Sequence, residues 1–219
     1  MKIGVVSDIH GNRVALDAVL SAMPAVDGLV CAGDVVGYNP MHGACVDALR
    51  ERSAQTVMGN HDRAVVEDSS FGFHSAAGAG VEHARETLTD DQQAWLAALP
   101  DERTAFDGRV KLVHGHPADP DRYTYPDAFG PELLDDEDVL VLGHTHVQGH
   151  ERFEDGIVMN PGSVGQPRDG NPQAAFAVLD LDRLSVTEHR VEYDIDRVQA
   201  AIEEANLPAE LGERLHEGR

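Results

Sequence analysis

Short apolar runs along the chain end repeatedly in Asp, Asn or His. The first three runs cover residues 2–7, 28–32 and 56–58, and apolar positions at helical spacing predict helices over 13–23 and 41–51. This alternation of strand and helix is typical of an α/β fold, in which binding sites form at the carboxyl ends of parallel strands. The polar residues at these three ends are Asp8 and His10, then Asp34, and then Asn60, His61 and Asp62.

The rest of the chain contains a helical segment followed by a strand-rich half. Residues 63–100 have helical character, and Thr89 with Gln92 forms a capping box. An Asp-Gly turn then separates two runs, 104–106 and 109–113, which predict a hairpin. Further along, the pattern predicts a short helix at 126–134, strands at 139–142, 149–153, 157–159, 174–180 and 184–191, a helix at 194–205 capped by Asp194, and a last helix from Pro208.

Two of these later runs also end in ligand-type residues: the hairpin leads to His114, and the run at 139–142 leads to His144 and His146. Seven of the residues at these five ends supply two carboxylates, one amide oxygen and four imidazoles, which can hold two divalent ions. They are Asp8, His10, Asp34, Asn60, His114, His144 and His146. One Asp must bridge the two ions, because otherwise neither ion has a negatively charged ligand on the side that faces the other ion. Such a site attracts a phosphate group and lowers the pKa of a bound water.

The length of 219 residues suits a single domain over 1–219, with C-terminal helices from about residue 194. No apolar run is long enough to span a bilayer and the N-terminus lacks a signal-peptide pattern, so we expect a cytoplasmic protein without a membrane partner. Cys31 and Cys45 are too few for a disulfide framework, and a buried free thiol is expected at Cys31.

The charge balance is strongly acidic, with 17 basic and 39 acidic residues and a formal net charge of −22. Because the acidic residues are spread along the chain, they resemble the solvated surface of a halophilic protein rather than an acidic tail. Long nucleic acid requires a basic face, and the sequence shows none. A small phosphoester is therefore the expected partner, and the sequence leaves open whether the chain forms a homo-oligomer.

The motifs at the five strand ends resemble the signature of the calcineurin-like metallophosphoesterase superfamily, in family order and over residues 1 to about 192. The segment 160–168 further resembles the small bacterial and archaeal branch of predicted phosphodiesterases. The motifs are Asp8-x-His10, Gly33-Asp34, Gly59-Asn60-His61-Asp62, His114-Gly115 and Gly143-His144-x-His146.

This resemblance implies a four-layer αββα sandwich of two facing mixed sheets flanked by helices. It also implies a dinuclear centre whose metal-activated hydroxide attacks a phosphoester, with Mn as the expected metal and Ni, Fe, Zn or Mg as alternatives. His61 would protonate the leaving oxygen, and Asp62 would orient His61. One ion would be held by Asp8, His10, Asp34 and His146, and the other by Asp34, Asn60, His114 and His144.

The chain departs from the protein phosphatases of the superfamily, which carry Asp-Arg-Gly after the second motif. The matching stretch here, residues 36–40, has no Arg, and Asp62 stands where Glu is common. Both differences argue against a phosphoprotein substrate, and the intact ligand set argues against the role of the retromer scaffold subunit. We therefore expect a phosphodiesterase; the alternatives are a phosphomonoesterase or nucleotide phosphatase of the same mechanism, a nuclease acting on short nucleotides, and a non-catalytic scaffold.

The candidate substrate contacts are Arg168, Asn12 and Tyr38. A loop Arg also serves as an ion-pair partner at a surface, and Asn12 is expected to cap the helix at 13–23. The sequence leaves open whether His116 acts beside the site, as a support for a ligand or a substrate contact, or is an ordinary loop residue. The remaining histidines are expected at the surface: His42, His74, His83, His150, His189 and His216.

Overall fold

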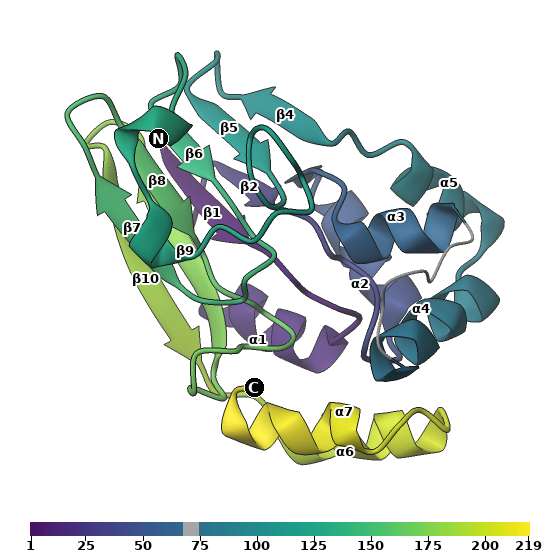
Figure 1. Ribbon diagram of the computed structural model, residues 1–219. Coiled ribbons are helices and arrows are strands. Elements are labelled where there is room, and N and C mark those ends of the chain that lie inside the picture. Colours follow the sequence, from purple (N-terminus) through teal and green to yellow (C-terminus); the bar gives the residue numbers. More distant parts are fainter. Residues whose placement is uncertain (68–74) are drawn as a thin grey trace.

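Two five-stranded β-sheets face each other in the computed structural model of the protein, which describes residues 1–67 and 75–219 (Figure 1). The first sheet has the strand order β10-β9-β1-β2-β3, and the second has the order β4-β5-β6-β8-β7. The first sheet contains β1 (Lys2–Val6), β2 (Gly28–Cys31), β3 (Gln55–Thr56), β9 (Ala174–Asp180) and β10 (Ser185–Val191). The second contains β4 (Glu102–Ala105), β5 (Val110–Val113), β6 (Val139–Val141), β7 (Gly149–Arg152) and β8 (Ile157–Asn160).

Strand β1 lies at the centre of the first sheet. It pairs in parallel with β2, where Val5 stands opposite Val30, and antiparallel with β9, where Val5 stands opposite Ala177. Residues 3–6 of β1 are buried, which explains why this strand is a continuous apolar run rather than an alternating one. Because β1 is the central strand and β2 runs parallel beside it, the loops that follow these two strands lie next to each other at the same end of the sheet.

Helices cover the outer face of the first sheet (Figure 1). One apolar cluster joins Leu16 and Leu49 of the helices to Phe176 of β9, and a second fills the space between the sheets, where Val30 and Leu112 belong to the same cluster. The α-helices are α1 (Arg13–Ala22), α2 (His42–Glu51), α3 (Asn60–Val66), α4 (Ser75–Thr87), α5 (Asp90–Ala97), α6 (Ile195–Glu204) and α7 (Glu210–Glu213).

The layer outside the second sheet is thinner than expected. In place of the helix predicted at 126–134, the chain makes two 3₁₀ turns, Pro126–Ala128 and Pro131–Leu133. Gly130 between them is extended, with φ −152°, and Pro131 has no N–H to continue a helix, so the two turns stay separate. Phe129 and Leu133 still pack over this face in one cluster with Leu140, so the expected fold class is confirmed.

Most other predicted elements are present with shifted ends. The capping box of Thr89 with Gln92, the hairpin of β4 with β5 and the cap of α6 by Asp194 are confirmed. Strand β3 is shorter than the predicted run and holds only Gln55 and Thr56.

The C-terminal helices lie along one end of the molecule (Figure 1). Val198, Leu211 and Leu215 form an apolar cluster with Tyr38 and Ala77. This packing places the last residues of the chain close to the loop that follows β2. None of the helices in the described part of the chain is long and apolar enough to cross a membrane.

Candidate metal centre

Several of the predicted ligands adopt a left-handed backbone conformation that is uncommon outside glycine. The φ angles are 52° at Asp8, 49° at His10, 54° at Asp34, 67° at His144 and 59° at His146. Such conformations are costly and persist where the surrounding structure enforces them, which is a property of functional sites. Here they turn the chain sharply at the strand ends.

The turning loops are held to one another by main-chain hydrogen bonds. The N–H of Asp8 donates to the Gly33 carbonyl at 3.0 Å, and the N–H of His10 donates to the Asp34 carbonyl at 2.9 Å. The N–H of His144 donates to both carboxylate oxygens of Asp8, at 3.2 and 3.1 Å. These bonds connect the ends of β1, β2 and β6, which belong to different sheets.

Two glycines allow the strand ends to approach this closely. A Cβ added at Gly59 would lie 2.0 Å from Oδ1 of Asp34, and one added at Gly33 would lie 2.8 Å from Nδ1 of His114. Gly33 also has φ +94°, so a side chain there would be strained as well as crowded.

The predicted ligands form two adjoining groups, and this confirms that they converge. Asp8, His10 and His146 make the first group, with Nε2 of His146 3.2 Å from Oδ1 of Asp8 and 3.1 Å from Nε2 of His10. Asp34, His114 and His144 make the second group. Atoms that share an ion at about 2.1 Å lie roughly 3 Å apart, so this spacing suits metal ligands.

Second contacts fix the direction in which each imidazole faces. His10, His114 and His146 each place Nδ1 against a main-chain carbonyl, at 3.1, 2.7 and 2.5 Å respectively. A carbonyl only accepts, so in each neutral ring Nδ1 carries the hydrogen and Nε2 presents a lone pair. His144 is reversed, because its Nε2 lies 3.0 Å from the Asp121 carbonyl, which leaves Nδ1 facing the site.

Lone pairs therefore face lone pairs in a buried space. Nε2 of His114 lies 3.1 Å from Oδ1 of Asn60 and 3.4 Å from Oδ2 of Asp34, although all three atoms are acceptors in the neutral ring state. This arrangement is repulsive unless positive charge lies between the atoms. The donor set thus fits bound cations, and its mixture of imidazole, carboxylate and amide oxygen suits divalent transition metals.

The electrostatics of the site also favour positive charge. Burial alone would lower the pKa of His114, but the carboxylates of Asp34 and Asp8 outweigh burial and raise it to about 10. Burial alone would raise the pKa of Asp34, but the imidazoles of His114 and His61 hold it well below its usual value. Both shifts favour a cationic charge beside Asp34.

Asp34 lies between the two groups of ligands. Its Oδ2 is 3.6 Å from Nε2 of His10 and 3.4 Å from Nε2 of His114, while its Oδ1 accepts a hydrogen bond from the His61 N–H at 2.9 Å. One carboxylate oxygen therefore faces both ligand groups, and the other fastens the start of α3.

His61 lies against the first group. Its ring is 4.8 Å from that of His10 and 4.6 Å from that of Tyr38, between ring centroids. Burial lowers the pKa of His61 to about 4, and Asp34 offsets this only in part. The low pKa favours the neutral ring. His61 also belongs to a group of potential ligands with His10 and Asp34, so geometry alone does not separate a ligand from a proton donor.

Asp62 acts through the backbone around His61. Its carboxylate accepts from the N–H groups of Val35 at 2.9 Å, Val36 at 3.1 Å and Gly59 at 3.0 Å. It thereby joins the loop after β2 to the turn before α3. Burial and the nearby Asp34 raise the pKa of Asp62 to about 7.

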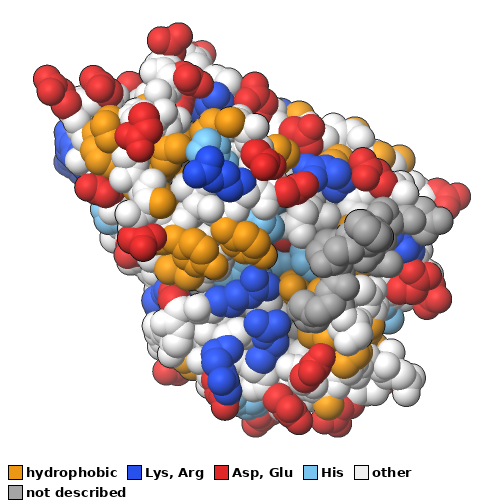
Figure 2. Space-filling model, in the orientation of Figure 1, with side chains coloured by type: hydrophobic (Ala, Val, Ile, Leu, Met, Phe, Trp, Pro, Cys, Tyr) orange, Lys and Arg blue, Asp and Glu red, His pale blue; other side chains and the backbone are white. Residues whose placement is uncertain are grey.

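Two of the three predicted substrate contacts lie beside the centre. The Arg168 guanidinium donates to the Tyr38 hydroxyl at 3.1 Å and to Oε1 of Gln166 at 2.8 Å. The Tyr38 ring is 4.7 Å from that of His10. Figure 2 shows histidine side chains in a hollow, with Lys and Arg gathered below them and acidic side chains over much of the surrounding surface.

Asn12 does not fit the role of a substrate contact. It is fully buried, its side-chain oxygen accepts from the Ala15 N–H at 3.0 Å, and its amide nitrogen donates to the Gly165 carbonyl at 3.0 Å. Both polar atoms of the amide are engaged with the backbone. Asn12 therefore caps α1, as predicted, and holds the loop at Gly165 in place.

The expectations for the other histidines are correct only in part. His42 is buried, with Nε2 3.2 Å from Nδ1 of His83, so its predicted surface position is wrong. His150 and His216 are exposed, His83 and His189 are half-buried, and His74 lies outside the described residues. His116 accepts from the Ala118 N–H at 3.0 Å, which is a turn contact. The Cys31 thiol is buried and free, as expected.

Two residues beside the site were missed by the sequence reasoning. The Tyr123 ring stacks on that of His144 at a centroid distance of 4.0 Å and is 50% exposed. The Arg214 guanidinium lies 6.0 Å from the centroid of the Tyr38 ring. Tyr123 comes from a loop and Arg214 from the C-terminal helical segment, far from the motifs in sequence, so no local signal placed them there.

Comparison with known proteins gives a consistent result. Residues 1–184 match the calcineurin-like phosphoesterase superfamily domain. The chain is 32% identical to the phosphodiesterase YfcE of Escherichia coli K12, over 85% of this chain and 91% of that protein. It is also 32% identical to an uncharacterized protein of Methanocaldococcus jannaschii, over 99% of this chain and 98% of that protein.

A solved structure extends the likeness to the whole fold. The metallophosphoesterase of Sphaerobacter thermophilus is 35% identical, with a TM-score of 0.89 over 100% of this chain and 99% of that one. With the converging ligands described above, these similarities show that the chain belongs to the calcineurin-like phosphoesterase superfamily and is a metal-dependent phosphoesterase.

Proposed function

We propose that the protein hydrolyses small phosphodiesters at a dinuclear metal centre. The observation that carries this proposal is the position of Asp34, whose Oδ2 lies 3.6 Å from Nε2 of His10 and 3.4 Å from Nε2 of His114. A single oxygen between two imidazole groups is what a bridging ligand of two ions requires. The similarity to a phosphodiesterase of Escherichia coli supports diester as the substrate class.

The two ligand sets follow from this position. Asp8, His10 and His146 would hold one ion, and Asn60, His114 and His144 the other, with Asp34 shared. Two bound divalent ions, Mn being our first choice, would provide an activated water and offset charge on the phosphoryl oxygens.

The chain's own residues complete the chemistry. His61, whose ring lies against His10 and Tyr38, would take a proton from solvent when the negatively charged phosphate binds beside it, and would pass that proton to the leaving oxygen. Asp62 is a positioning residue, because it fixes the turn that carries His61. Arg168 would donate to a non-bridging oxygen of the substrate from beside Tyr38.

The proposal is tested by comparing Asn60→Ala with His61→Ala. Both variants should lose turnover of an alkyl diester by about 10²–10⁴-fold, the usual contribution of general acid catalysis in the case of His61. Only Asn60→Ala should also lower the metal content, because Oδ1 of Asn60 faces Nε2 of His114. The measurements are steady-state rates and metal per chain by atomic emission.

The leaving group separates the role of His61 from that of a ligand. A p-nitrophenyl diester needs little protonation on leaving, so His61→Ala should slow its hydrolysis much less than that of the alkyl diester. His150→Ala, at an exposed position, is the matched control and should change neither rate. Equal losses with both leaving groups, together with reduced metal content, would assign His61 as a ligand instead.

The identity of the metal requires a matrix of ions and substrates. Mn, Ni, Zn, Mg and Fe would each be assayed with monoesters, diesters and nucleotide phosphoesters. The proposal expects diesters to be the better substrates and Mn to give the highest kcat/KM. Higher turnover of monoesters with every ion would favour a phosphatase.

A further inference from the structure

Two arginines from distant parts of the chain flank the same tyrosine ring. Arg168, in the loop before β9, lies 5.6 Å from the centroid of the Tyr38 ring, and Arg214, after α7, lies 6.0 Å from it. Tyr38 in turn lies against the rings of His10 and His61. The C-terminal segment thus adds a guanidinium one aromatic ring away from the metal centre.

Neither guanidinium forms an ion pair with an Asp or Glu side chain within the described part of the chain. Other arginines of this acidic protein do, such as Arg63 with Asp121 at 2.7 Å. Arg168 instead donates to Gln166 and Tyr38, and Arg214 donates through Nε to the main-chain oxygen of Arg219. Arg168 and Arg214 are half-buried and carry the same charge, so they repel each other, and a bound anion would relieve this repulsion.

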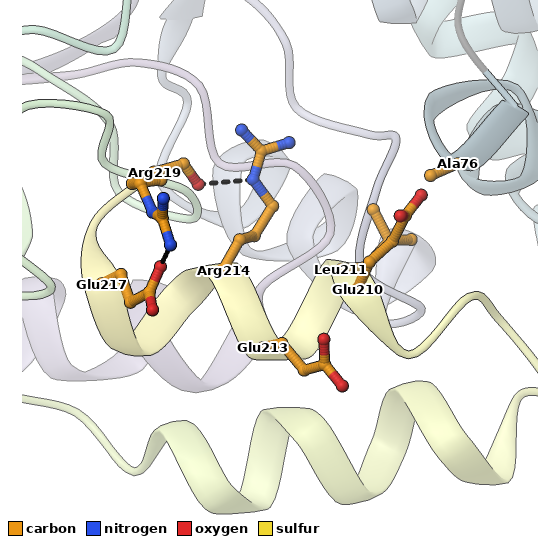
Figure 3. Close-up of a pocket in the computed structure, with 7 residues that line it drawn as sticks. All are labelled: Ala76, Glu210, Leu211, Glu213, Arg214, Glu217 and Arg219. Atoms are coloured by element: carbon orange, nitrogen blue, oxygen red, sulfur yellow. Dashed lines mark hydrogen bonds and ion pairs between the residues drawn. The ribbon is translucent and has the colours of Figure 1, made fainter.

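The orientation of the Arg214 guanidinium suits contact with a bound ligand. Figure 3 shows its two terminal nitrogens pointing away from the carboxylates of Glu213 and Glu217. Glu217 is paired with Arg219 instead. The groove that Arg214 lines has a volume of about 490 Å³, but Glu210, Glu213 and Glu217 line it too, so only the side of Arg214 toward Tyr38 suits an anion. Burial and the charge of Arg168 lower the pKa of Arg214, which agrees with two cations lying close together.

We propose that Arg168 and Arg214 together bind a second phosphate group of the substrate, so that the preferred substrates are phosphodiesters carrying an additional phosphate. Arg168 lies nearer the metal centre, since its N–H donates to the His146 carbonyl at 3.2 Å. Arg214 extends the positive surface outward past Tyr38. Guanidinium groups suit this task because they donate two parallel hydrogen bonds to phosphate oxygens. This inference depends on the proposed function only for the phosphoester that is hydrolysed, and not for the second phosphate site.

Binding of two matched nucleotides tests the second phosphate site without requiring turnover. Thymidine 3′,5′-bisphosphate and thymidine 5′-monophosphate differ only in the additional phosphate. Titration calorimetry of the metal-loaded protein should show tighter binding of the bisphosphate. Arg214→Gln should weaken that binding about tenfold or more, as expected for a charge-assisted contact, and leave the monophosphate unchanged. Arg214→Lys should recover part of the lost affinity, because Lys keeps the positive charge but lacks the two parallel N–H donors of the guanidinium.

Arg197→Gln is the control for charge, because Arg197 is exposed on the neighbouring α6 and the substitution changes the net charge equally. It should affect neither ligand. Equal weakening of both nucleotides by Arg214→Gln, or no weakening at all, would overturn the second phosphate site. The p-nitrophenyl esters of the same two nucleotides then report on the reaction. If the bisphosphate preference holds but neither ester is cleaved, the proposed function fails while the second phosphate site stands.

Discussion

The two carboxylate oxygens of Asp34 have different surroundings. Oδ1 accepts from the His61 N–H, whereas Oδ2 faces the imidazoles of His10 and His114 from the two ligand groups. A residue shared by two ions is needed by both, while His10 belongs to the first group with Asp8 and His146. We therefore expect Asp34→Asn to reduce the binding of both ions, and His10→Ala to reduce mainly one.

Metal stoichiometry after exhaustive dialysis distinguishes these outcomes: near zero ions for Asp34→Asn and about one for His10→Ala, against two for the unchanged protein. Asn keeps an oxygen for the His61 N–H, so the fold should be retained, and thermal unfolding of the metal-free proteins serves as the control. If Asp34→Asn kept one tightly bound ion, the shared role of Asp34 would be wrong.

At the scale of single residues, the sequence predicted the ligands better than the residues around them. Asp8, His10 and Asp34 directly follow buried strands, so their convergence was fixed by local order. Tyr123 and Arg214 reach the site from a loop and from the C-terminal segment, whose places depend on tertiary packing. His42 was misplaced because the start of α2 packs on Gly11, where an added Cβ would lie 2.6 Å from Nδ1 of His42.

At the scale of elements, Asn12 connects two segments that shape the site. Its oxygen caps α1 through the Ala15 N–H, and its nitrogen holds the Gly165 carbonyl of the loop that leads to Arg168. Asn12→Ser should keep the cap but lose the second bond, whereas Asn12→Ala should lose both. The free energy of unfolding should therefore fall by about 1 kcal/mol more for Ala than for Ser, the usual value of an N-cap.

The loop contact should be visible in catalysis as well. Because both variants release Gly165, both should raise KM to a similar extent through a displaced Arg168, measured alongside chemical denaturation. Equal stabilities of the two variants would contradict the capping role of Asn12, and an unchanged KM would contradict its hold on the loop. Ser21→Ala, on the exposed side of α1, provides the control, since its hydroxyl donates only to the Asp17 carbonyl.

Element types were easier to predict than element ends. The apolar runs predicted β1 and β2 correctly, because strands that are buried on both faces carry apolar residues at consecutive positions. The segment 126–134 looked like one helix, but Gly130 and Pro131 divide it into two 3₁₀ turns. Strand β3 is limited to the two residues that pair with Val30 and Cys31 of β2. The local pattern of apolar residues does not show which residues pair across a sheet.

At the scale of the whole molecule, the negative charge should control stability. A net charge of −22 repels itself more strongly in the folded state than in the expanded chain, and salt screens this repulsion. The screening length falls from about 30 Å at roughly 0.01 M to about 3 Å at 1 M salt. We therefore expect the melting temperature to rise by about 5 °C or more between these concentrations, which corresponds to a few kcal/mol for a chain of this size.

The dependence on pH shows whether charge is the cause. Near pH 4.7, the isoelectric point of the sequence, many carboxylates are protonated and the net charge approaches zero. The rise in melting temperature with NaCl should then be much smaller than at pH 7.5. Scanning calorimetry of the metal-free protein across both pH values and salt concentrations makes the comparison, with sucrose as an uncharged co-solute. A salt effect of equal size at both pH values would point to general exclusion of salt from the surface, and the acidic surface would then have no special part in stability.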